Sequence, residues 1–465
     1  MYASDPLVIP DRSQTPSAGV AWPFDDVSTL SRDAGFQLRR ALLLLNAAGL
    51  LAGYYVMYNE WMQLGWCGAM TVMWLAAGGI HELTEGLRRD AWLVAAFGLI
   101  FLVLVRSSVL DSPGMSVGDL WWGWFKSATL LPVLLMLWQV ARSPRVIRRI
   151  GLPMVAMATV AALVSGLVFY RLDPEGMFAT RLKNWFVYGG LNSVCTALTF
   201  GFAAIWAAAC WNSATDKKER RLWFAALIPL QAATLFTLSR GAFFALIAGH
   251  LALLIICGWR RAWKPLAVLA VMVGLFQLSG PLLSDVAVKD AAARLGVADQ
   301  AVAAEMIGDS VVSSNPIWAM VERADNGRFG IFQAAVNSMT TWQDWTFGKG
   351  LWSSNDFWSC SLHWYPEHLH SIFTDALVRG GIPTLVGLLA LLGWGAWRVI
   401  LLARQGEDIW LMLATFGGCA LLFDGDSAFS LLTVPRYEPL LLWVPMVMAS
   451  ARYLGHKAAL ERLKR

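Results

Sequence analysis

Long apolar runs separated by short polar connections occupy most of the chain. A helix needs about 20 apolar residues to cross the hydrocarbon of a bilayer, and about twelve runs approach that length. The runs lie near residues 41–57, 65–80, 91–105, 119–141, 151–170, 188–211, 222–238, 242–259, 265–280, 382–403, 409–424 and 431–451. This pattern predicts an all-α integral membrane protein with about twelve transmembrane helices.

The composition agrees with this fold class. Hydrophobic residues make up 57% of the 465 residues and charged residues only 15%, whereas a soluble protein carries about 25% charged residues. The first forty residues are polar and contain several prolines. We therefore expect a cytoplasmic tail there, and no cleavable signal peptide.

The distribution of positive charge predicts the orientation in the membrane. Basic residues gather in the connections on the side that holds both termini, as in the segment 217–221. Short cytoplasmic connections carry an excess of Lys and Arg, so we expect both termini in the cytoplasm. The expected organisation is a cytoplasmic N-terminal tail (1–40), nine transmembrane helices (41–280), one large periplasmic loop domain (281–371), three further helices (372–453) and a cytoplasmic C-terminal tail (454–465).

The loop 281–371 is where we expect a water-facing function, because loops of this length are usually functional. Apolar residues recur in it at a spacing of three to four: Phe329, Phe332, Val336 and Met339. This spacing predicts an amphipathic helix that lies on the membrane or caps a cavity, with Asn326 as its N-cap.

Several arginines on the non-cytoplasmic side need an explanation, because the insertion rule disfavours them there. Arg240 is the clearest case, since its connection between two apolar runs is only a few residues long. It either keeps the two helices apart or contacts a phosphate through its bidentate, permanently charged guanidinium. Arg181, Lys183 and Arg379 are further candidates for binding an anion, each with a structural role as the alternative.

Histidines cluster in the second half of the loop, at His363, His368 and His370. Together they could bind a metal ion or stabilise the fold, or one of them could act as a general base. We favour the base, because no cysteine or acidic pattern accompanies them. His370 precedes a predicted helix, whose N-terminus favours the neutral imidazole that a base requires. We therefore expect no metal ion and no other cofactor.

Four stretches follow one another along the chain in a characteristic order. They are Ser239-Arg240-Gly241-Ala242, the stretch from Gly327 to Ala335, Phe347-Gly348-Lys349-Gly350, and His370-Ser371 followed by Leu377, Gly381 and Ile382. Their order, on a polytopic chain with one late large loop, resembles the O-antigen ligase and polymerase superfamily of polytopic glycosyltransferases. The resemblance covers residues 170–400. Two positions depart from the family pattern: Ser371 replaces the commoner Asn, and Arg379 stands where an acidic residue is frequent.

The resemblance implies a GT-C-like membrane enzyme that acts at the periplasmic face of a Gram-negative inner membrane. Ligases of this family transfer a polysaccharide from undecaprenyl diphosphate to a sugar hydroxyl of lipid A–core oligosaccharide. In this chain His370 would be the base, Arg240, Arg181, Arg379 and Lys183 would bind the diphosphate, and His368, Arg328 and His363 would be accessory residues. The expected partners are the lipid-linked glycan, lipid A–core and membrane lipids, with no nucleic acid.

Two kinds of alternative function stay open. An O-antigen polymerase or a protein O-oligosaccharyltransferase would use the same donor with another acceptor. A transporter or flippase for lipid-linked sugars would place ionisable residues and broken helices near the middle of the membrane. Here most charges lie at helix ends, and the unexplained ones lie on one side. This asymmetry favours an enzyme that acts at the membrane surface.

Overall fold

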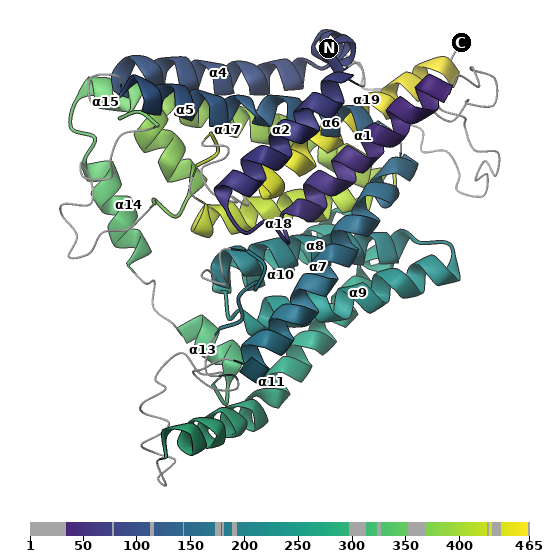
Figure 1. Ribbon diagram of the computed structural model, residues 1–465, viewed down its shortest axis with the longest axis vertical. Coiled ribbons are helices and arrows are strands. Elements are labelled where there is room, and N and C mark those ends of the chain that lie inside the picture. Colours follow the sequence, from purple (N-terminus) through teal and green to yellow (C-terminus); the bar gives the residue numbers. More distant parts are fainter. Residues whose placement is uncertain are drawn as a thin grey trace, which may run out of the picture.

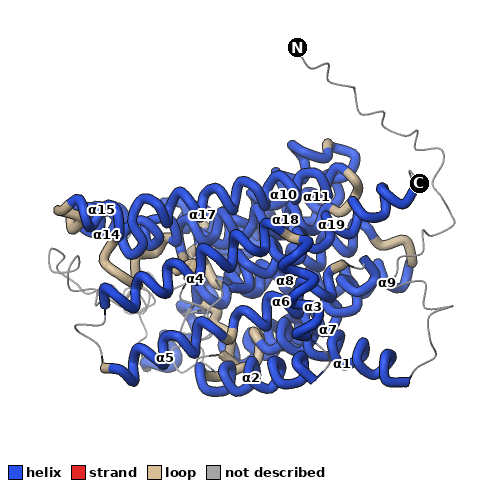
Figure 2. The backbone as a smooth tube through the Cα atoms, turned by 90° about the horizontal axis from the view of Figure 1, so that it is seen from above, coloured by secondary structure: helices blue, strands red, loops and turns tan. Residues whose placement is uncertain are grey.

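The computed structural model describes residues 34–76, 79–111, 116–142, 144–172, 178, 181–187, 193–296, 313–322, 327–351, 368–425, 427–429 and 439–463. Every regular element in these ranges is a helix, and no strand occurs in them (Figures 1 and 2). The all-helical fold class is therefore confirmed for the described part of the chain.

Helices follow the predicted apolar runs. Those that precede the large loop are α1 (Ala34–Gly53), α2 (Glu60–Ala76), α3 (Gly79–Arg89), α4 (Ala91–Asp111), α5 (Val117–Ala128), α6 (Leu130–Ala141), α7 (Pro144–Leu172), α8 (Ser193–Ser213), α9 (Lys217–Phe236), α10 (Arg240–Cys257) and α11 (Trp259–Leu295). Those that follow are α13 (Pro316–Glu322), α14 (Arg328–Asn337), α15 (Trp342–Phe347), α17 (Ile372–Arg404), α18 (Asp408–Asp424), the π-helical turn η4 (Pro439–Trp443) and α19 (Val444–Leu463).

Six of the described helices are long and apolar enough to cross a membrane, namely α4, α7, α8, α10, α11 and α17. Shorter apolar helices occur at Ala41–Gly53, Leu64–Ala76 and Leu131–Ala141. The chain is thus a multi-pass membrane protein, as its apolar pattern predicts. The larger count of about twelve crossings stays a prediction.

Two features of the first half differ from the predicted runs. The run 119–141 is divided at Thr129 into α5 and α6, because Pro132 has no N–H group to donate to the carbonyl four residues earlier. The amphipathic helix α3, which ends in Arg88 and Arg89, is too short and too polar for a search for long apolar runs to detect.

Helical structure continues into the segment predicted as the large loop. Helix α11 has 37 residues, a length of about 55 Å at 1.5 Å per residue, so it extends well past the predicted start of the loop at residue 281. Its last turns are polar and carry ion pairs between Lys289 and Asp285 and between Arg294 and Asp290. Helix α14 begins after Gly327, whose φ is 76°, and the predicted cap Asn326 lies outside the described residues.

Helix α8 forms the centre of the bundle and α11 its margin, since 89% of the apolar window of α8 is buried but only 17% of that of α11. Helix α8 packs chiefly against α9, and α10 packs against α18. Helix α8 also packs against α18, and glycine permits a close approach there: a Cβ on Gly201 of α8 would lie 2.6 Å from the ring of Phe416 on α18. Small residues at helix contacts are what allow membrane helices to approach closely.

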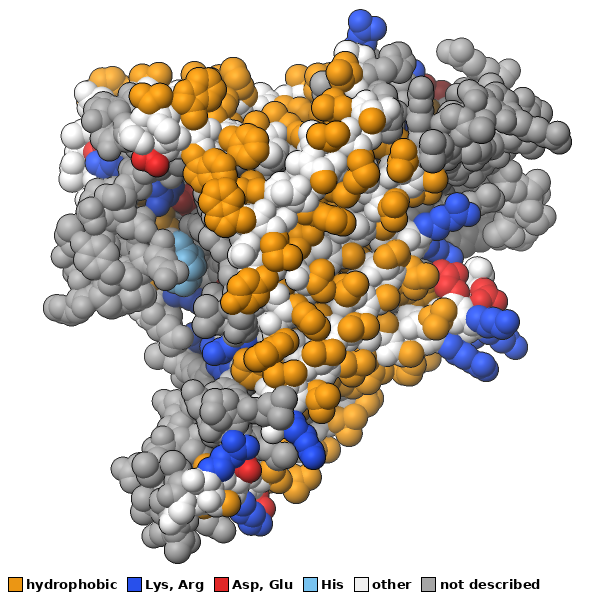
Figure 3. Space-filling view, in the orientation of Figure 1, with side chains coloured by type: hydrophobic (Ala, Val, Ile, Leu, Met, Phe, Trp, Pro, Cys, Tyr) orange, Lys and Arg blue, Asp and Glu red, His pale blue; other side chains and the backbone are white. Residues whose placement is uncertain are grey.

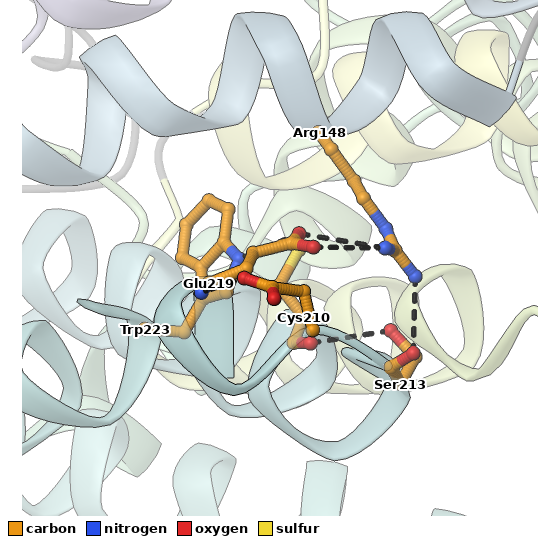
Figure 4. A network of polar contacts seen from close by, with 6 residues as sticks. Arg148, Cys210, Ser213, Glu219 and Trp223 are labelled. Atoms are coloured by element: carbon orange, nitrogen blue, oxygen red, sulfur yellow. Dashed lines mark hydrogen bonds and ion pairs between the residues drawn. The ribbon is translucent and has the colours of Figure 1, made fainter. Parts of the chain in front are cut away.

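An ion pair joins α7 to α9 at the end of the bundle where α8 ends. Arg148 of α7 lies 3.2 Å from Oε2 of Glu219 and donates to the carbonyl of Ser213 at 3.0 Å (Figure 4). Trp223 Nε1 donates to the same Glu219 carboxylate at 3.1 Å. The charged segment at the start of α9 is therefore fixed to both neighbouring helices.

A second charged cluster joins the turn before α18 to α19. Arg452 Nε donates to the carboxylate of Glu407 at 2.6 Å, and His456 Nε2 lies 2.5 Å from the same oxygen. Burial raises the pKa of Glu407, but hydrogen bonds and positive charge from His456 and Arg452 outweigh it, so the pKa lies below its ordinary value. This carboxylate is therefore ionised near neutral pH.

We expect Glu407→Gln to lower the stability of the protein at neutral pH by about 1–3 kcal/mol, because Arg452 would lose its charged partner. A carboxylate whose pKa is lowered by folding contributes stability above its unfolded pKa, and this contribution disappears as the pH falls through the folded pKa. The difference in melting temperature between wild type and variant should therefore shrink below the ordinary glutamate pKa of 4.5. Thermal unfolding in detergent tests this, with the exposed Glu461→Gln as control. A difference that does not change with pH would contradict it.

Candidate functional site

Charged side chains of the described structure gather where α9 ends and α10 and α17 begin, called the site end below. The short helices α13, α14 and α15 lie beside this end (Figure 1). In the space-filling view a histidine and several Lys or Arg side chains lie along the same edge, next to a surface that is mostly apolar (Figure 3). The site end thus presents positively charged side chains next to a mostly apolar surface.

The buried carboxylate of Asp424 lies at the centre of this charged region. Asp424 is the last residue of α18, and its side chain is only 2% exposed. It forms an ion pair with Arg328, the first residue of α14. A loop helix is therefore attached to the membrane bundle by a charge pair that is largely removed from water.

The Ser-Arg-Gly stretch fits around the same carboxylate. Ser239 caps α10, and its hydroxyl accepts a hydrogen bond from the N–H of Ala242. A Cβ on Gly241 would overlap Oδ2 of Asp424, so only glycine lets the carboxylate approach the helix start. The positive end of the α10 dipole also stabilises an anion at this place. The glycine of this motif is explained by a residue far away in the sequence.

Two further arginines act on Asp424 electrostatically, namely Arg181 and Arg240. Arg240 is the first residue of α10 and is half-buried. Arg181 is held by a hydrogen bond from its Nε to the carbonyl of Thr237, at 2.7 Å. We call Arg181, Arg240 and Arg328, with Asp424, the arginine cluster.

The histidine segment lies next to the arginine cluster. The rings of His368 and His370 are 4.0 Å apart between centroids. Leu369 between them is fully buried, in a cluster that includes Ile331 of α14. Hydrophobic burial of Leu369 thus holds the two imidazoles at the surface of the loop domain.

The start of α17 brings His370 near Asp424. Ser371 is the N-cap of α17, and a Cβ on Gly425 would lie 3.2 Å from the backbone nitrogen of Ile372. Gly425 follows Asp424 directly, and Ile372 follows His370 by two positions. The sequence prediction of His370 beside a helix start is confirmed in its geometry, while its role as a base stays a prediction.

Backbone strain is concentrated in the same region. Phe178, Leu238 and His370 are the non-glycine residues with positive φ in the described part of the chain, at 58°, 52° and 57°. Such conformations are costly for residues with a Cβ and persist where the surroundings impose them, often at functional sites. Leu238 precedes the cap of α10, and Phe178 lies three residues before Arg181. The strain supports the assignment of this end as the functional one.

Arg379 is engaged in holding a turn. Its Nε lies 2.8 Å from the buried Asp375 carboxylate, and its Nη1 donates to the carbonyl of Leu351 at 3.0 Å. It is 8% exposed. The structure thus gives Arg379 partners within the fold, and its contact with a diphosphate stays a prediction.

The Phe-Gly-Lys-Gly turn is attached to a break in α17. Gly381 has φ 74° and ψ 175°, which interrupts the helix. The N–H groups of Lys349 and Gly350 donate to the freed carbonyls of Val378 and Arg379, at 2.8 and 3.0 Å. The contact between this turn and the break at Gly381 was not predicted, because nothing in the sequence between them indicates that the two segments pack together.

We expect Gly381→Ala to detach this turn, because the new Cβ would overlap the carbonyl oxygen of Thr346 and the positive φ would be strained. Strain of this kind costs about 1–3 kcal/mol. The variant should melt at a lower temperature and be cut faster by protease near residues 347–351. Gly393→Ala is the matched control, since a Cβ there meets no atom within 4 Å. Equal behaviour of the two variants would contradict this role for Gly381.

The remaining predicted residues are placed as follows. Lys183 Nζ lies 5.9 Å from the centre of the Phe169 ring. Arg328, which we had expected only as an accessory residue, forms the ion pair with Asp424. His363 lies outside the described residues. Within the described ranges no three His, Cys, Asp or Glu side chains gather closely enough to hold a metal ion.

Asp424 was missed by sequence reasoning. An acidic residue at the end of an apolar run is the ordinary boundary of a membrane helix, so its position alone carries no functional signal. The one available hint was the doublet Asp424-Gly425 on the side of the chain where the unexplained arginines lie.

The comparisons with known proteins give one result for the site. No curated protein matches this chain. Residues 224–389 match the family model of the O-antigen ligase, Wzy_C. The matched range contains Arg240, Arg328 and His370, and members of the family are ligases and polymerases that transfer glycans. This match runs from α9 into α17, so this part of the chain is similar to the O-antigen ligase family.

Proposed function

We propose that this protein is an O-antigen ligase. It transfers a polysaccharide from undecaprenyl diphosphate to a sugar hydroxyl of lipid A–core oligosaccharide. The observation that carries the proposal is the arginine cluster around a buried carboxylate, beside the start of the helix that follows His370. Members of the matched family act on lipid-linked glycans, and the cluster suits the anionic part of such a donor.

The arginine cluster accounts for the departure of the leaving group. When the bond between the anomeric carbon and the diphosphate oxygen breaks, its electron pair stays on that oxygen. Donors already aimed at the developing charge stabilise it without rearrangement, which is usually the largest catalytic term. Arg240 and Arg181 are the diphosphate contacts. Arg328 is the third diphosphate contact, and its ion pair with Asp424 fixes its position.

His370 accounts for the activation of the acceptor. A sugar hydroxyl is a weak acid, so a base has to take its proton as the oxygen attacks the anomeric carbon. The imidazole of His370 accepts this proton, and the new glycosidic bond forms as the diphosphate leaves. Direct attack inverts the configuration at the anomeric carbon. His368, whose ring lies against that of His370, is an accessory group.

The reaction of this proposal needs no metal ion, because permanently charged guanidinium groups neutralise the leaving diphosphate. It takes place at the periplasmic face of a Gram-negative inner membrane, with both termini in the cytoplasm. The excess of basic residues at the opposite helix ends supports this orientation.

Ligation in liposomes tests the function. Purified protein, lipid-linked glycan and lipid A–core should give glycan joined to lipid A–core, and the rate should be unchanged by chelator. Lengthening of the lipid-linked glycan without lipid A–core would show a polymerase instead. Loss of activity with chelator would contradict metal independence. Movement of intact lipid-linked glycan across the bilayer, with no new glycosidic bond, would show a flippase.

A further inference from the structure

The short helix α13 is held against α11 at the site end (Figure 1). The side-chain amide of Gln277 on α11 donates to Oδ1 of Asn315, and its Oε1 accepts a hydrogen bond from the N–H of Ile317 at 3.0 Å. A Cβ on Gly280 would lie 2.7 Å from the carbonyl oxygen of Ser314, so glycine lets the loop approach α11 closely. A helix of seven residues is too short to be stable alone. These contacts with α11 therefore fix the place of α13.

A methionine attaches α13 to the residues that connect α9 with α10. Met320 is 1% exposed. It belongs to a buried apolar cluster, called the α13 cluster below, that consists of Leu235, Leu238, Phe243, Phe276 and Met320. Leu238 lies between the end of α9 and the start of α10. Through Met320, a helix of the large loop thus packs with the residues directly before α10.

Two residues with a strained backbone pack in this cluster. Leu238, a member of the cluster, has a φ of 52°, and Phe178, which packs against the cluster, has a φ of 58°. Such a φ is costly for a residue with a Cβ, and it persists only where the surroundings impose it. Leu238 is 3% exposed, and a relaxed backbone would turn its side chain out of the cluster. Apolar burial in the α13 cluster therefore holds the backbone of Leu238 in its strained conformation.

The strained residue lies between two supports of the arginine cluster. The carbonyl of Thr237 accepts a hydrogen bond from Nε of Arg181 at 2.7 Å. Ser239 is the N-cap of α10, and Arg240 is the first residue of that helix. We call residues 237–239 the Leu238 turn. The dihedral angles of Leu238 set the direction of the Thr237 carbonyl relative to the start of α10, so a change in them would move Arg181 with respect to Arg240.

We propose that α13 is a positioning element of the reaction: Met320 holds the Leu238 turn, and the turn places Arg181 and Arg240 relative to one another. This proposal rests on the proposed function, because it assigns a further residue to the site of that reaction. Met320 acts through Leu238 and touches no substrate. Donors stabilise a developing charge fully only when they are aimed at it in advance, whereas misaligned arginines still attract the bound diphosphate. Loss of the Met320 side chain should therefore affect kcat more than KM.

Truncation of Met320 provides the first test. Met320→Ala should lower kcat by roughly 10- to 10²-fold, because a displacement of about 1 Å in a catalytic group is costly, and should leave KM for the lipid-linked donor within about twofold of wild type. Met320→Leu, which has a similar volume, should recover most of kcat. Met136→Ala on α6 is the matched control, because Met136 is also 1% exposed and lies outside the α13 cluster. A wild-type kcat in Met320→Ala, or an equal loss of kcat in Met136→Ala, would overturn the proposal.

A double-mutant cycle tests whether the effect of Met320 passes through Leu238. Glycine adopts a positive φ without strain, so Leu238→Gly makes the conformation of the turn independent of the α13 cluster. In that background Met320→Ala should lower kcat by less than about twofold, because the two side chains no longer interact. If Met320→Ala lowers kcat by the same factor in both backgrounds, its effect does not pass through the turn and the proposal fails.

Hydrogen exchange provides a test that does not depend on transfer. The N–H of Leu238 donates to the carbonyl of Leu235 at 2.9 Å. Peptides that cover residues 235–242 should exchange faster in Met320→Ala than in wild type or in Met136→Ala, because the turn opens more often. Unchanged exchange in Met320→Ala would contradict the proposal. Faster exchange in this variant, together with a wild type that transfers no glycan, would refute the proposed function and leave α13 as the support of the Leu238 turn.

Discussion

Replacing His370 with asparagine should lower the rate of glycan transfer by about 10²–10⁴-fold, the usual contribution of a general base. Asparagine is the informative substitution, because His370 has φ 57° and asparagine tolerates this conformation better than alanine. The variant therefore removes the base while keeping the backbone. Its melting temperature should stay close to that of wild type.

The pH profile separates a chemical role from a structural one. A base acts only when it is unprotonated, so the wild-type rate should rise with pH and then level off. The residual rate of His370→Asn should lack this rise. His368→Asn is the comparison, since its ring lies against that of His370. If His370→Asn keeps the rate and His368→Asn loses it, the base is His368.

Local patterns were sufficient to predict the six long apolar helices. The cost of an unpaired backbone group in lipid leaves a long apolar run few alternatives to a helix. Ser239-Arg240-Gly241 also stood out in the sequence, because arginine is costly between apolar runs, although we expected a short connection there and the structure shows the capped start of α10. Short and polar elements such as α3 were not predicted, since their pattern is no stronger than that of a connection.

Contacts between distant segments could not be predicted in this way. Nothing near Asp424 indicates that Arg328, 96 residues earlier, forms an ion pair with it. Likewise, the carbonyls freed at Gly381 bind the Lys349 turn only because α15 packs beside α17. The sequence offered Arg379 as an anion contact with a structural role as the alternative, and it did not indicate that the buried Asp375 would be its ion-pair partner. A charged residue next to an apolar run can be predicted to need an ion-pair partner, but the partner itself depends on contacts between distant segments.

These contacts give Arg328 and Arg240 different roles. Arg328 carries part of the fold, because removing it would leave Asp424 buried with less compensation, which is strongly destabilising. Arg240 belongs to the start of a helix that Ser239 already caps and that Gly241 already fits against Asp424. Arg240 can therefore be removed with less damage to the structure, and a change in activity after its removal reflects lost contact with the substrate more directly.

We expect Arg240→Ala to lower kcat/KM by about 10²–10³-fold, the effect of removing one donor to a developing oxyanion. Arg240→Lys should recover part of this loss, because lysine keeps the charge but not the bidentate geometry that suits a phosphate. Both variants should keep a melting temperature near that of wild type, whereas Arg328→Ala should not.

Arg171→Ala, at an exposed arginine at the end of α7, controls for the loss of positive charge alone. Activity of Arg240→Ala equal to that of Arg171→Ala would show that Arg240 only separates α9 from α10. If Arg240→Ala loses activity and Arg171→Ala does not, Arg240 contacts the diphosphate. A structural cause is then excluded, because Ser239, Gly241 and the Arg328–Asp424 pair hold the fold around Arg240.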